Sequence, residues 1–194
     1  MRTARIGPNA ITRVAEVLRS RFGDGATKAL FGSAGLAAYL ARPPEDMVDE
    51  AEVACLHRCL REELGTDLAR EVGRAAGIRT ADYLLARRIP HAVQWCLRRL
   101  PAELAGPLLL VAIRRNAWTF VGSGRFVARA GRPVRLSIRG NPLCRGISSS
   151  VPLCDYYAAT FERMFRELVH PNIHAVETAC EAAAAPACVF ELRW

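Results

Sequence analysis

The stretch V-E-T-A-C-E-A-A-A-A-P-A-C-V-F, at residues 176–190, contains the features that decide the fold of the C-terminal half. It holds Glu177, Cys180 and Cys188, and Cys154 upstream completes the pattern Cys-x22-Glu-x2-Cys-x7-Cys. Three thiolates and one carboxylate supply the four ligands of a closed tetrahedral zinc site, which keeps no position open for water. The pattern therefore predicts a structural zinc. The alternative is that the cysteines are small apolar core residues, a common role for free cysteine.

Strand geometry restricts how these residues meet. Side chains alternate along a strand, so Glu177 and Cys180 would point to opposite faces of a regular one. We therefore expect Cys180 just past a strand end or at a bulge, with Cys188 returning beside Glu177 on the partner strand. Cys154 is expected at a helix N-terminus, where the helix dipole favours a thiolate. Cys144, in an upstream loop, could approach the same site as a competing ligand.

The same stretch is similar to the closing signature of the four-vinyl-reductase domain family, a class of small-molecule-binding modules. The resemblance covers nearly the whole chain and is strongest to members that serve bacteriochlorophyll biosynthesis. Its other motifs are R-I-G-P-N-A-I at residues 5–11, M-V-D-E at 47–50, T-A-D-Y-L-L at 80–85, A-W-T-F-V-G-S-G at 117–124 and C-D-Y-Y-A-A-T-F at 154–161. The resemblance implies zinc on the four matched residues. One departure is that alanines at 182–185 replace the family's usual Gly-Asp turn.

Length and composition limit the class of protein. A chain of 194 residues suffices for one full-sized core, so we expect a single domain over residues 1–194. The net charge is +8, but the arginines are spread in pairs such as Arg87-Arg88 and Arg114-Arg115, and nucleic acid is not the expected partner. We expect neither a secretory signal nor a transmembrane segment, and hence a cytoplasmic protein, with room for a peripheral position beside membrane-associated pigment enzymes. Seven cysteines fit that reducing compartment.

The apolar periodicity predicts an α+β fold. It is helical from residue 9 to about residue 115. Within this range Pro43-Pro44, Gly65, Gly77, Pro90 and Pro101 are expected to divide it into several short helices. Strands are predicted at residues 118–121, 125–128, 134–138, 173–179 and 187–193, a loop at 140–152 and a helix at 155–169. We expect a helical layer (1–115) beside a four-stranded, mainly antiparallel sheet with a long helix before the last hairpin (116–194).

A small-molecule site needs a cavity, and the sequence offers candidates for its lining. Trp95, Trp118, Phe120 and Tyr157 could form aromatic walls around a flat tetrapyrrole, although such residues are more often plain core. His91 is the candidate axial ligand to a chelated magnesium. These five positions are the predicted ligand-binding residues.

The family's name implies reduction of a vinyl group, which needs a source of electrons. Neither glycine-rich segment, at 32–35 or 122–124, has the context of a dinucleotide site, and three cysteines with one glutamate are not an iron–sulfur ligand set. We therefore expect no catalytic residues, but a zinc-stabilised accessory or carrier protein that binds chlorophyllide or a magnesium-porphyrin and contacts bacteriochlorophyll-pathway enzymes. The alternatives are a divinyl chlorophyllide 8-vinyl reductase with an external reductant, and a ligand sensor. Related domains often form dimers, so a homodimer through the helical layer is a further expectation.

Overall fold

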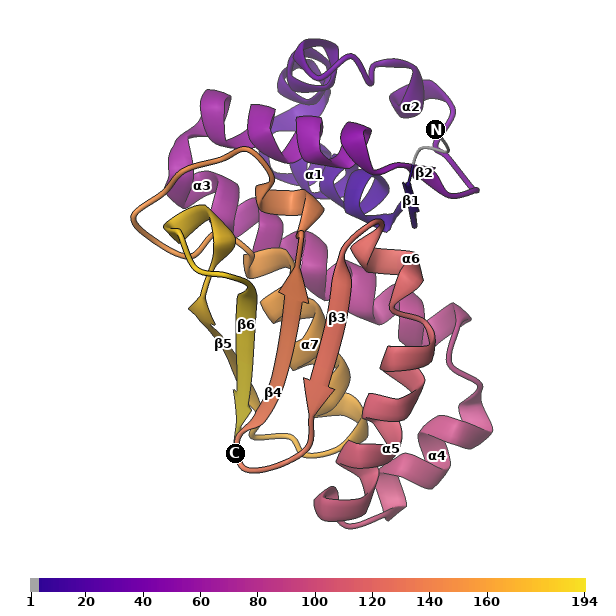
Figure 1. The fold of residues 1–194 in the computed structure, drawn as a ribbon. Coiled ribbons are helices and arrows are strands. Elements are labelled where there is room, and N and C mark those ends of the chain that lie inside the picture. The colour runs from indigo at the N-terminus through magenta and orange to yellow at the C-terminus, as the bar shows by residue number, and fades with distance from the viewer. Residues whose placement is uncertain (1–3) are drawn as a thin grey trace.

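The computed structural model describes residues 4–194, and a helical part precedes a four-stranded sheet (Figure 1). The predicted α+β fold is confirmed. The elements in order are β1 (Arg5–Ile6), α1 (Asn9–Ser33), α2 (Ala38–Ala41), β2 (Val48–Asp49), α3 (Glu50–Arg87), α4 (His91–Arg99), α5 (Ala102–Arg115), α6 (Trp118–Val121), β3 (Arg125–Arg129), β4 (Val134–Arg139), the 3-10 helix η1 (Pro142–Cys144), α7 (Asp155–Leu168), β5 (His174–Ala179), the 3-10 helix η2 (Glu181–Ala183) and β6 (Cys188–Arg193).

The main sheet has the strand order β3-β4-β6-β5, and every neighbouring pair is antiparallel. β4 alternates as predicted, since Val134, Leu136 and Ile138 are buried while the side chains between them are exposed or half-buried. Leu136 pairs with Phe190 of β6, so the two central strands share one apolar face. That face carries the core, and the other face meets solvent.

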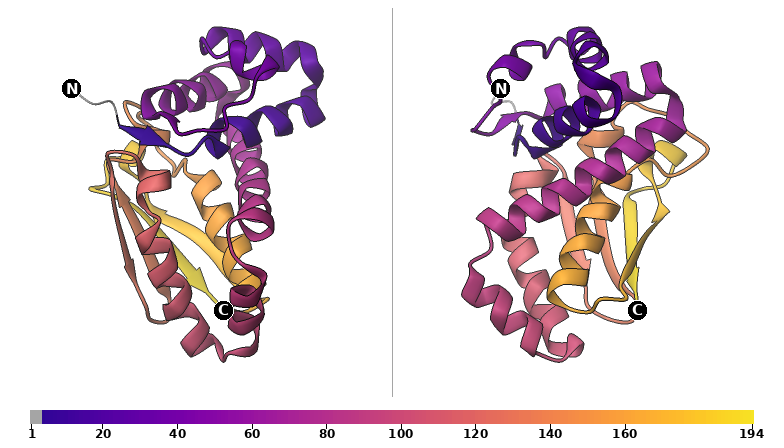
Figure 2. Two further views of the ribbon diagram at one scale, coloured as in Figure 1. Left: turned by 90° about the vertical axis from the view of Figure 1, so that its right-hand side faces the viewer. Right: turned by 180° about the vertical axis from the view of Figure 1, so that it is seen from behind.

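Helix α7 lies between this apolar face and α3, as the edge-on view shows (Figure 2, left). On the sheet side Phe161 meets Phe190 with ring centroids 5.6 Å apart. On the other side α3 comes so close that a Cβ added at Gly77 would overlap the carbonyl oxygen of Tyr156. Only glycine allows this approach. Across it, Thr160 Oγ1 donates a hydrogen bond to Gly77 O at 3.1 Å. The helix before the last hairpin is therefore enclosed on both sides.

The strand predicted at residues 118–121 is wrong, because these residues form the single helical turn α6. Tertiary contacts fix the turn. Gly7 N donates to Thr119 O at 2.7 Å and Tyr157 Oη donates to Phe120 O at 2.6 Å, so these carbonyl oxygens are satisfied without a neighbouring strand. The aromatic and β-branched composition had indicated a strand, but packing overrides such a preference in so short a segment.

The predicted division of the first half by Pro and Gly is confirmed at Gly65 and wrong at Gly77. α1 spans 25 residues and α3 spans 38, and each is kinked at a glycine with a non-helical backbone, Gly23 with φ of 79° and Gly65 with φ of 76°. Gly77 remains helical because it faces α7, where its missing side chain is needed. A glycine in a helical pattern therefore marks a close contact as readily as a break.

Candidate metal centre

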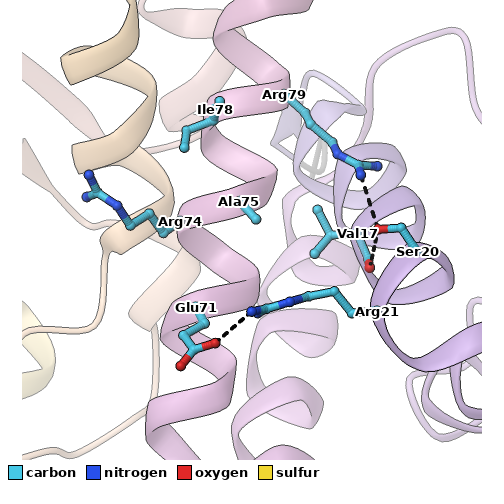
Figure 3. A pocket seen from close by; sticks show the side chains of 8 residues that line it. All are labelled: Val17, Ser20, Arg21, Glu71, Arg74, Ala75, Ile78 and Arg79. Carbon is cyan, nitrogen blue, oxygen red and sulfur yellow. Dashed lines mark hydrogen bonds and ion pairs between the residues drawn. The ribbon is translucent and has the colours of Figure 1, made fainter.

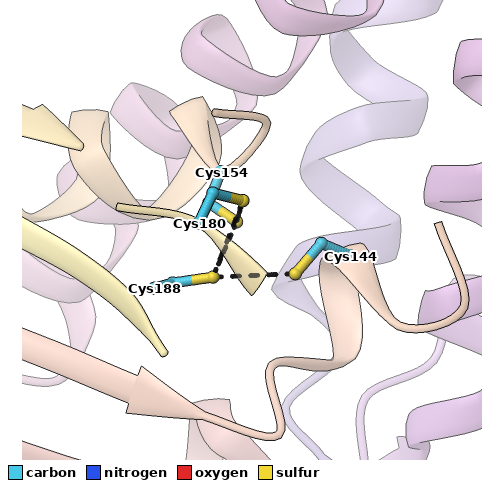
Figure 4. A group of neighbouring side chains, drawn as sticks. All are labelled: Cys144, Cys154, Cys180 and Cys188. Carbon is cyan, nitrogen blue, oxygen red and sulfur yellow. Dashed lines mark hydrogen bonds between the residues drawn. The ribbon is translucent and has the colours of Figure 1, made fainter. Parts of the chain in front are cut away.

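Four cysteine sulfurs meet where the end of the sheet approaches α7. The Sγ atoms of Cys144, Cys154, Cys180 and Cys188 all lie within 4.8 Å of one another, and all four residues are buried (Figure 4). Cys144 ends η1, Cys154 caps α7, Cys180 follows β5 and Cys188 begins β6. Residues from four separate segments thus converge on one point.

Four of the six sulfur–sulfur distances match the edges of one tetrahedron. They are 3.6 Å for Cys154–Cys188, 3.9 Å for Cys154–Cys180, 3.8 Å for Cys180–Cys188 and 3.6 Å for Cys144–Cys188. Zinc–sulfur bonds of about 2.3 Å in a regular tetrahedron place the sulfurs about 3.8 Å apart. The residues present therefore fit a single zinc ion with a closed shell of four thiolates.

Four thiols are also the usual ligand set of an iron–sulfur cluster. The sequence pattern contains three cysteines, and Cys144 supplies the fourth. In a cluster, however, the cysteines bind two or four different iron atoms. Sulfurs spaced as the edges of one tetrahedron instead fit a mononuclear ion.

The hairpin geometry agrees with the sequence in two respects and differs in one. Cys180 lies just past the end of β5, after a register shift between Glu177 and Ala179, and Cys154 is the residue before the first turn of α7, both as predicted. The expectation that Cys188 lies beside Glu177 is wrong, because Glu177 pairs with Phe190. Cys188 comes two residues before Phe190 in β6, so it lies nearer to the turn and to Cys180.

The four donor atoms that converge are all cysteine sulfurs, and none belongs to Glu177. The role of Glu177 as a metal ligand stays a prediction. Its Oε2 accepts a hydrogen bond from Cys154 N at 2.7 Å, while Oε1 is buried without a partner among the described residues. Burial first, and then the charge of Cys180, raise the pKa of Glu177 to about 8. The carboxyl group therefore lies at the edge of the sulfur cluster and fixes the start of α7.

Arg61 of α3 holds both cysteine-bearing loops. Its Nη1 donates to Leu143 O at 2.9 Å and its Nη2 to Leu153 O at 3.2 Å, so it binds the residues just before Cys144 and Cys154. Burial lowers the pKa of Arg61, and the negative charge of the cysteines opposes that shift. A half-buried cation beside four thiols favours their thiolate form.

Asn141 supplies hydrogen bonds directly to sulfur. Its Nδ2 donates to Cys154 Sγ at 3.1 Å and to Cys188 Sγ at 3.3 Å, and the side chain is fully buried. Glu181 fixes the loop in turn, because its carboxylate accepts from the backbone nitrogens of Gly140 and Asn141, both at 2.7 Å. Such outer contacts orient metal ligands and stabilise their charged form.

Close contacts among the sulfurs shift the pKa values of three of the thiols. Contacts with Cys144 first, and then with Cys154 and Cys188, lower the pKa of Cys180. The contact with Cys144 is the first cause that raises the pKa of Cys154 and that of Cys188. Of these three thiols, Cys180 is the one whose ionised form its neighbours favour.

One of the alanines that replace the family's Gly-Asp turn adopts the backbone conformation that glycine favours. Ala184 has φ of 61°, and it is the only residue other than glycine with positive φ among residues 4–194. An L-residue in this region costs roughly 1–2 kcal/mol. The turn is thus as tight as a glycine turn, at a cost in stability.

The five predicted ligand-binding residues do not meet at one place. Phe120 and Tyr157 pack with ring centroids 6.1 Å apart, in an aromatic cluster with Phe126, Phe161 and Phe190 that fills the space between α7 and the sheet. His91 is exposed at the start of α4. Trp95 and Trp118 are 59% and 62% exposed.

The cavities lie elsewhere. One of about 380 Å³ opens between α1 and α3, with Val17, Ala75 and Ile78 as its apolar lining (Figure 3). Its polar lining is Ser20, Arg21, Glu71, Arg74 and Arg79. A second, of about 330 Å³, is bounded by α3, α7 and β5 and includes Glu177.

Comparison with known proteins defines the class first. Residues 134–194 match the four-vinyl-reductase domain, and these residues include all four clustered cysteines. Among solved structures, an unliganded Fe(II) H-NOX protein from K. algicida aligns with a TM-score of 0.62 at 10% identity, over 97% of this chain and 96% of that one. A second chain, from work on heme redox potential and protein-induced porphyrin distortion, aligns with a TM-score of 0.55 at 13% identity, over 97% of this chain and 100% of that one. At such identities the likeness shows the fold alone.

Two relatives then define the family. The bacteriochlorophyll synthase 23 kDa chain of Cereibacter sphaeroides is 45% identical over 97% of this chain and 90% of its own length. That of Rhodobacter capsulatus is 38% identical over 97% and 86%. This chain therefore belongs to the family of the bacteriochlorophyll synthase 23 kDa chains, and it combines a four-vinyl-reductase domain with an H-NOX-like fold.

Proposed function

We propose that this chain is a tetrapyrrole-binding accessory or carrier protein of bacteriochlorophyll biosynthesis, acting in the cytoplasm beside enzymes of that pathway. The observation that carries the proposal is the 45% identity, over nearly the full length of both chains, to a protein named as a chain of bacteriochlorophyll synthase. A tetrapyrrole is the ligand class to test first, because one protein of similar fold was studied for the distortion of its porphyrin.

Zinc has a structural role in this proposal. Cys144, Cys154, Cys180 and Cys188 would hold it, and Glu177 would keep its hydrogen bond to Cys154 N. Four protein ligands leave no open position for substrate or water. The ion would join η1, α7 and the final hairpin, and its contribution would be to stability rather than to chemistry on the tetrapyrrole.

The cavity between α1 and α3 is the candidate tetrapyrrole site. Its volume of about 380 Å³ lies near the lower end of the usual range for small-molecule sites. Arg21 and Arg79 border its apolar lining, and both are engaged by neighbours, Arg21 with Glu71 at 2.8 Å and Arg79 with Ser20 Oγ at 3.1 Å. A ligand carboxylate could take over either guanidinium in a charge-assisted hydrogen bond.

Titration of the purified, zinc-loaded protein with a magnesium-porphyrin, with and without NADPH, tests this function. We expect a saturable shift of the porphyrin absorption and no change in the vinyl-sensitive band when NADPH is added. Arg79→Gln should weaken binding several-fold, whereas Arg163→Gln, which removes a half-buried arginine of α7 away from this cavity, should not. Absence of binding would refute the carrier, and NADPH-dependent loss of the vinyl band would identify a reductase instead.

A further inference from the structure

The net positive charge of the chain is concentrated in one segment. Residues 87–129 contain eight arginines and a single acidic residue, Glu103, whereas the rest of the chain has 19 basic and 18 acidic residues. The arginine pairs that seem scattered along the sequence therefore fall in one acid-poor region, formed by α4, α5, α6 and β3. In Figure 1 these helices lie along one edge of the molecule, away from β5.

The same region exposes an unusual amount of apolar surface. Six of the twelve exposed large hydrophobic residues found within residues 4–194 lie between positions 93 and 118. Leu104, Leu108 and Val111 recur at helical spacing on the outer face of α5, at 56%, 54% and 43% exposure. The inner face, which includes Leu109 and Leu110, is buried, so α5 is apolar on both sides. A helix of this kind normally has a partner on each face.

The arginines of this region have few acidic partners. Of the eight, only Arg98 forms an ion pair among the described residues, with Glu167 at 3.7 Å. Arg114 and Arg115 occupy the last turn of α5, just beyond its exposed apolar stripe. Arg99 lies over the ring of Trp95, with its guanidinium carbon 4.2 Å from the ring centroid. Exposed tryptophan and aliphatic side chains thus alternate with unpaired positive charge.

We propose that this surface, the α4–α6 face, docks on an anionic phospholipid bilayer. The face is defined by Val93, Trp95, Leu104, Leu108, Val111 and Trp118, together with Arg99, Arg114 and Arg115. Aliphatic side chains and tryptophans would enter the interface between headgroups and acyl chains, while the guanidinium groups bind lipid phosphate. None of the helices within residues 4–194 combines the length and the hydropathy that a membrane span requires, and α5 has only 14 residues.

Charge selects this occupant over two others. A second copy of the chain, paired face to face, would bring two surfaces of the same strong positive charge together. A nucleic acid would satisfy the arginines but not the exposed leucines and valine of α5. A bilayer with acidic headgroups matches both properties.

Flotation of the full chain with vesicles tests the proposal. We expect binding to vesicles of phosphatidylcholine with phosphatidylglycerol, little binding to phosphatidylcholine alone, and release at high salt. In a Trp194→Phe background, brominated acyl chains should quench the emission of Trp95 and Trp118. Arg114→Gln/Arg115→Gln should weaken binding at least about tenfold, given roughly fivefold for each arginine near such a surface. Leu104→Gln/Leu108→Gln should abolish the quenching.

Matched control variants distinguish a role of the α4–α6 face from a general effect of lost charge or lost apolar surface. Lys28→Gln/Arg42→Gln removes the same charge from two exposed residues elsewhere, and Val176→Gln removes an exposed side chain of β5; both should bind like the parent. Circular dichroism shows whether each variant is folded. No binding to the anionic vesicles, or equal loss in face and control variants, overturns the proposal. So does a dimer in sedimentation that Leu104→Gln/Leu108→Gln dissociates, because the occupant would then be a second copy.

Discussion

Arg61 Nη1 lies 2.9 Å from the carbonyl oxygen of Leu143, although the two residues are 82 positions apart. The same guanidinium reaches Leu153 O, so one side chain of α3 fixes the approach of both Cys144 and Cys154. The helical part and the cysteine cluster are therefore coupled directly. Loss of this arginine should affect the cysteine cluster, not only local packing.

Arg61→Gln should lower the free energy of unfolding by about 3 kcal/mol, because hydrogen bonds from a charged donor to buried carbonyl groups are each worth roughly 1.5–3 kcal/mol. The variant should also release zinc at a lower concentration of chelator. Arg58→Gln, one turn earlier on α3 and half exposed, should change stability by less than about 0.5 kcal/mol. Equal effects of the two substitutions would contradict the role of Arg61.

The sequence identified part of this centre and missed the rest for physical reasons. Cys154, Cys180 and Cys188 lie at the start of α7, just after β5 and at the start of β6. The apolar periodicity of the sequence predicts where these elements lie. Cys144 lies in a loop, and the sequence suggested it only as a competing ligand, because no local pattern states where a loop returns. Arg61 has the sequence context of any solvated arginine on a helix. Only the tertiary fold shows that it is turned toward two distant carbonyl groups.

The secondary-structure elements also divide into those that local sequence patterns predict and those that depend on tertiary contacts. The sheet strands and α7 were predictable from alternation and from the apolar stripe of the helix. α6 was not, because its conformation depends on Gly7 and Tyr157, which contact it from distant parts of the chain. The continuation of α3 through Gly77 was not predictable, because the role of this glycine is visible only beside α7.

Ala184→Gly should raise the free energy of unfolding by about 1 kcal/mol, since glycine adopts positive φ without the steric cost that alanine bears. Ala183→Gly is the matched control. It lies in η2 without positive φ, and its replacement should instead lower stability by roughly 0.5 kcal/mol. Chemical denaturation of both variants measures the difference, and the same sign for both would contradict the strained turn.

Gly77→Ala should destabilise the protein by about 3 kcal/mol, at the upper end for overpacking, because the new methyl group meets the backbone of Tyr156 and α7 must move away from α3. Gly25→Ala, in open space on α1, should raise stability by roughly 0.5 kcal/mol. Thermal unfolding of the pair tests the close approach of the two helices. A mild effect at Gly77 would show that this contact is looser.

His57 should make stability depend on pH. Burial first, and then the charge of Arg61, lower the pKa of His57 to about 3, and its Nε2 contacts Ala10 O at 3.2 Å. The unfolded chain binds a proton near pH 6.5 while the folded protein does not. This contribution is therefore fully present above pH 6.5 and falls by about 1.4 kcal/mol per unit as the pH drops toward 3.

His57→Gln should remove that slope. Unfolding free energies of the parent and the variant, measured between pH 7 and roughly pH 5, isolate the effect because all other titrating groups are common to both. His91→Gln, which replaces an exposed imidazole, should keep the slope of the parent. A parallel pH dependence for parent and His57→Gln would show that His57 is protonated inside the folded protein.

Zinc K-edge X-ray absorption on the purified protein, with metal analysis of the same sample, tests the central claim most directly. We expect one zinc per chain with a first shell of four sulfur atoms at about 2.3 Å. Cys144→Ala should reduce the shell to three sulfurs, and Glu177→Gln should leave all four. A native shell of three sulfurs and one oxygen, or a protein without stoichiometric zinc, would contradict the four-cysteine zinc centre.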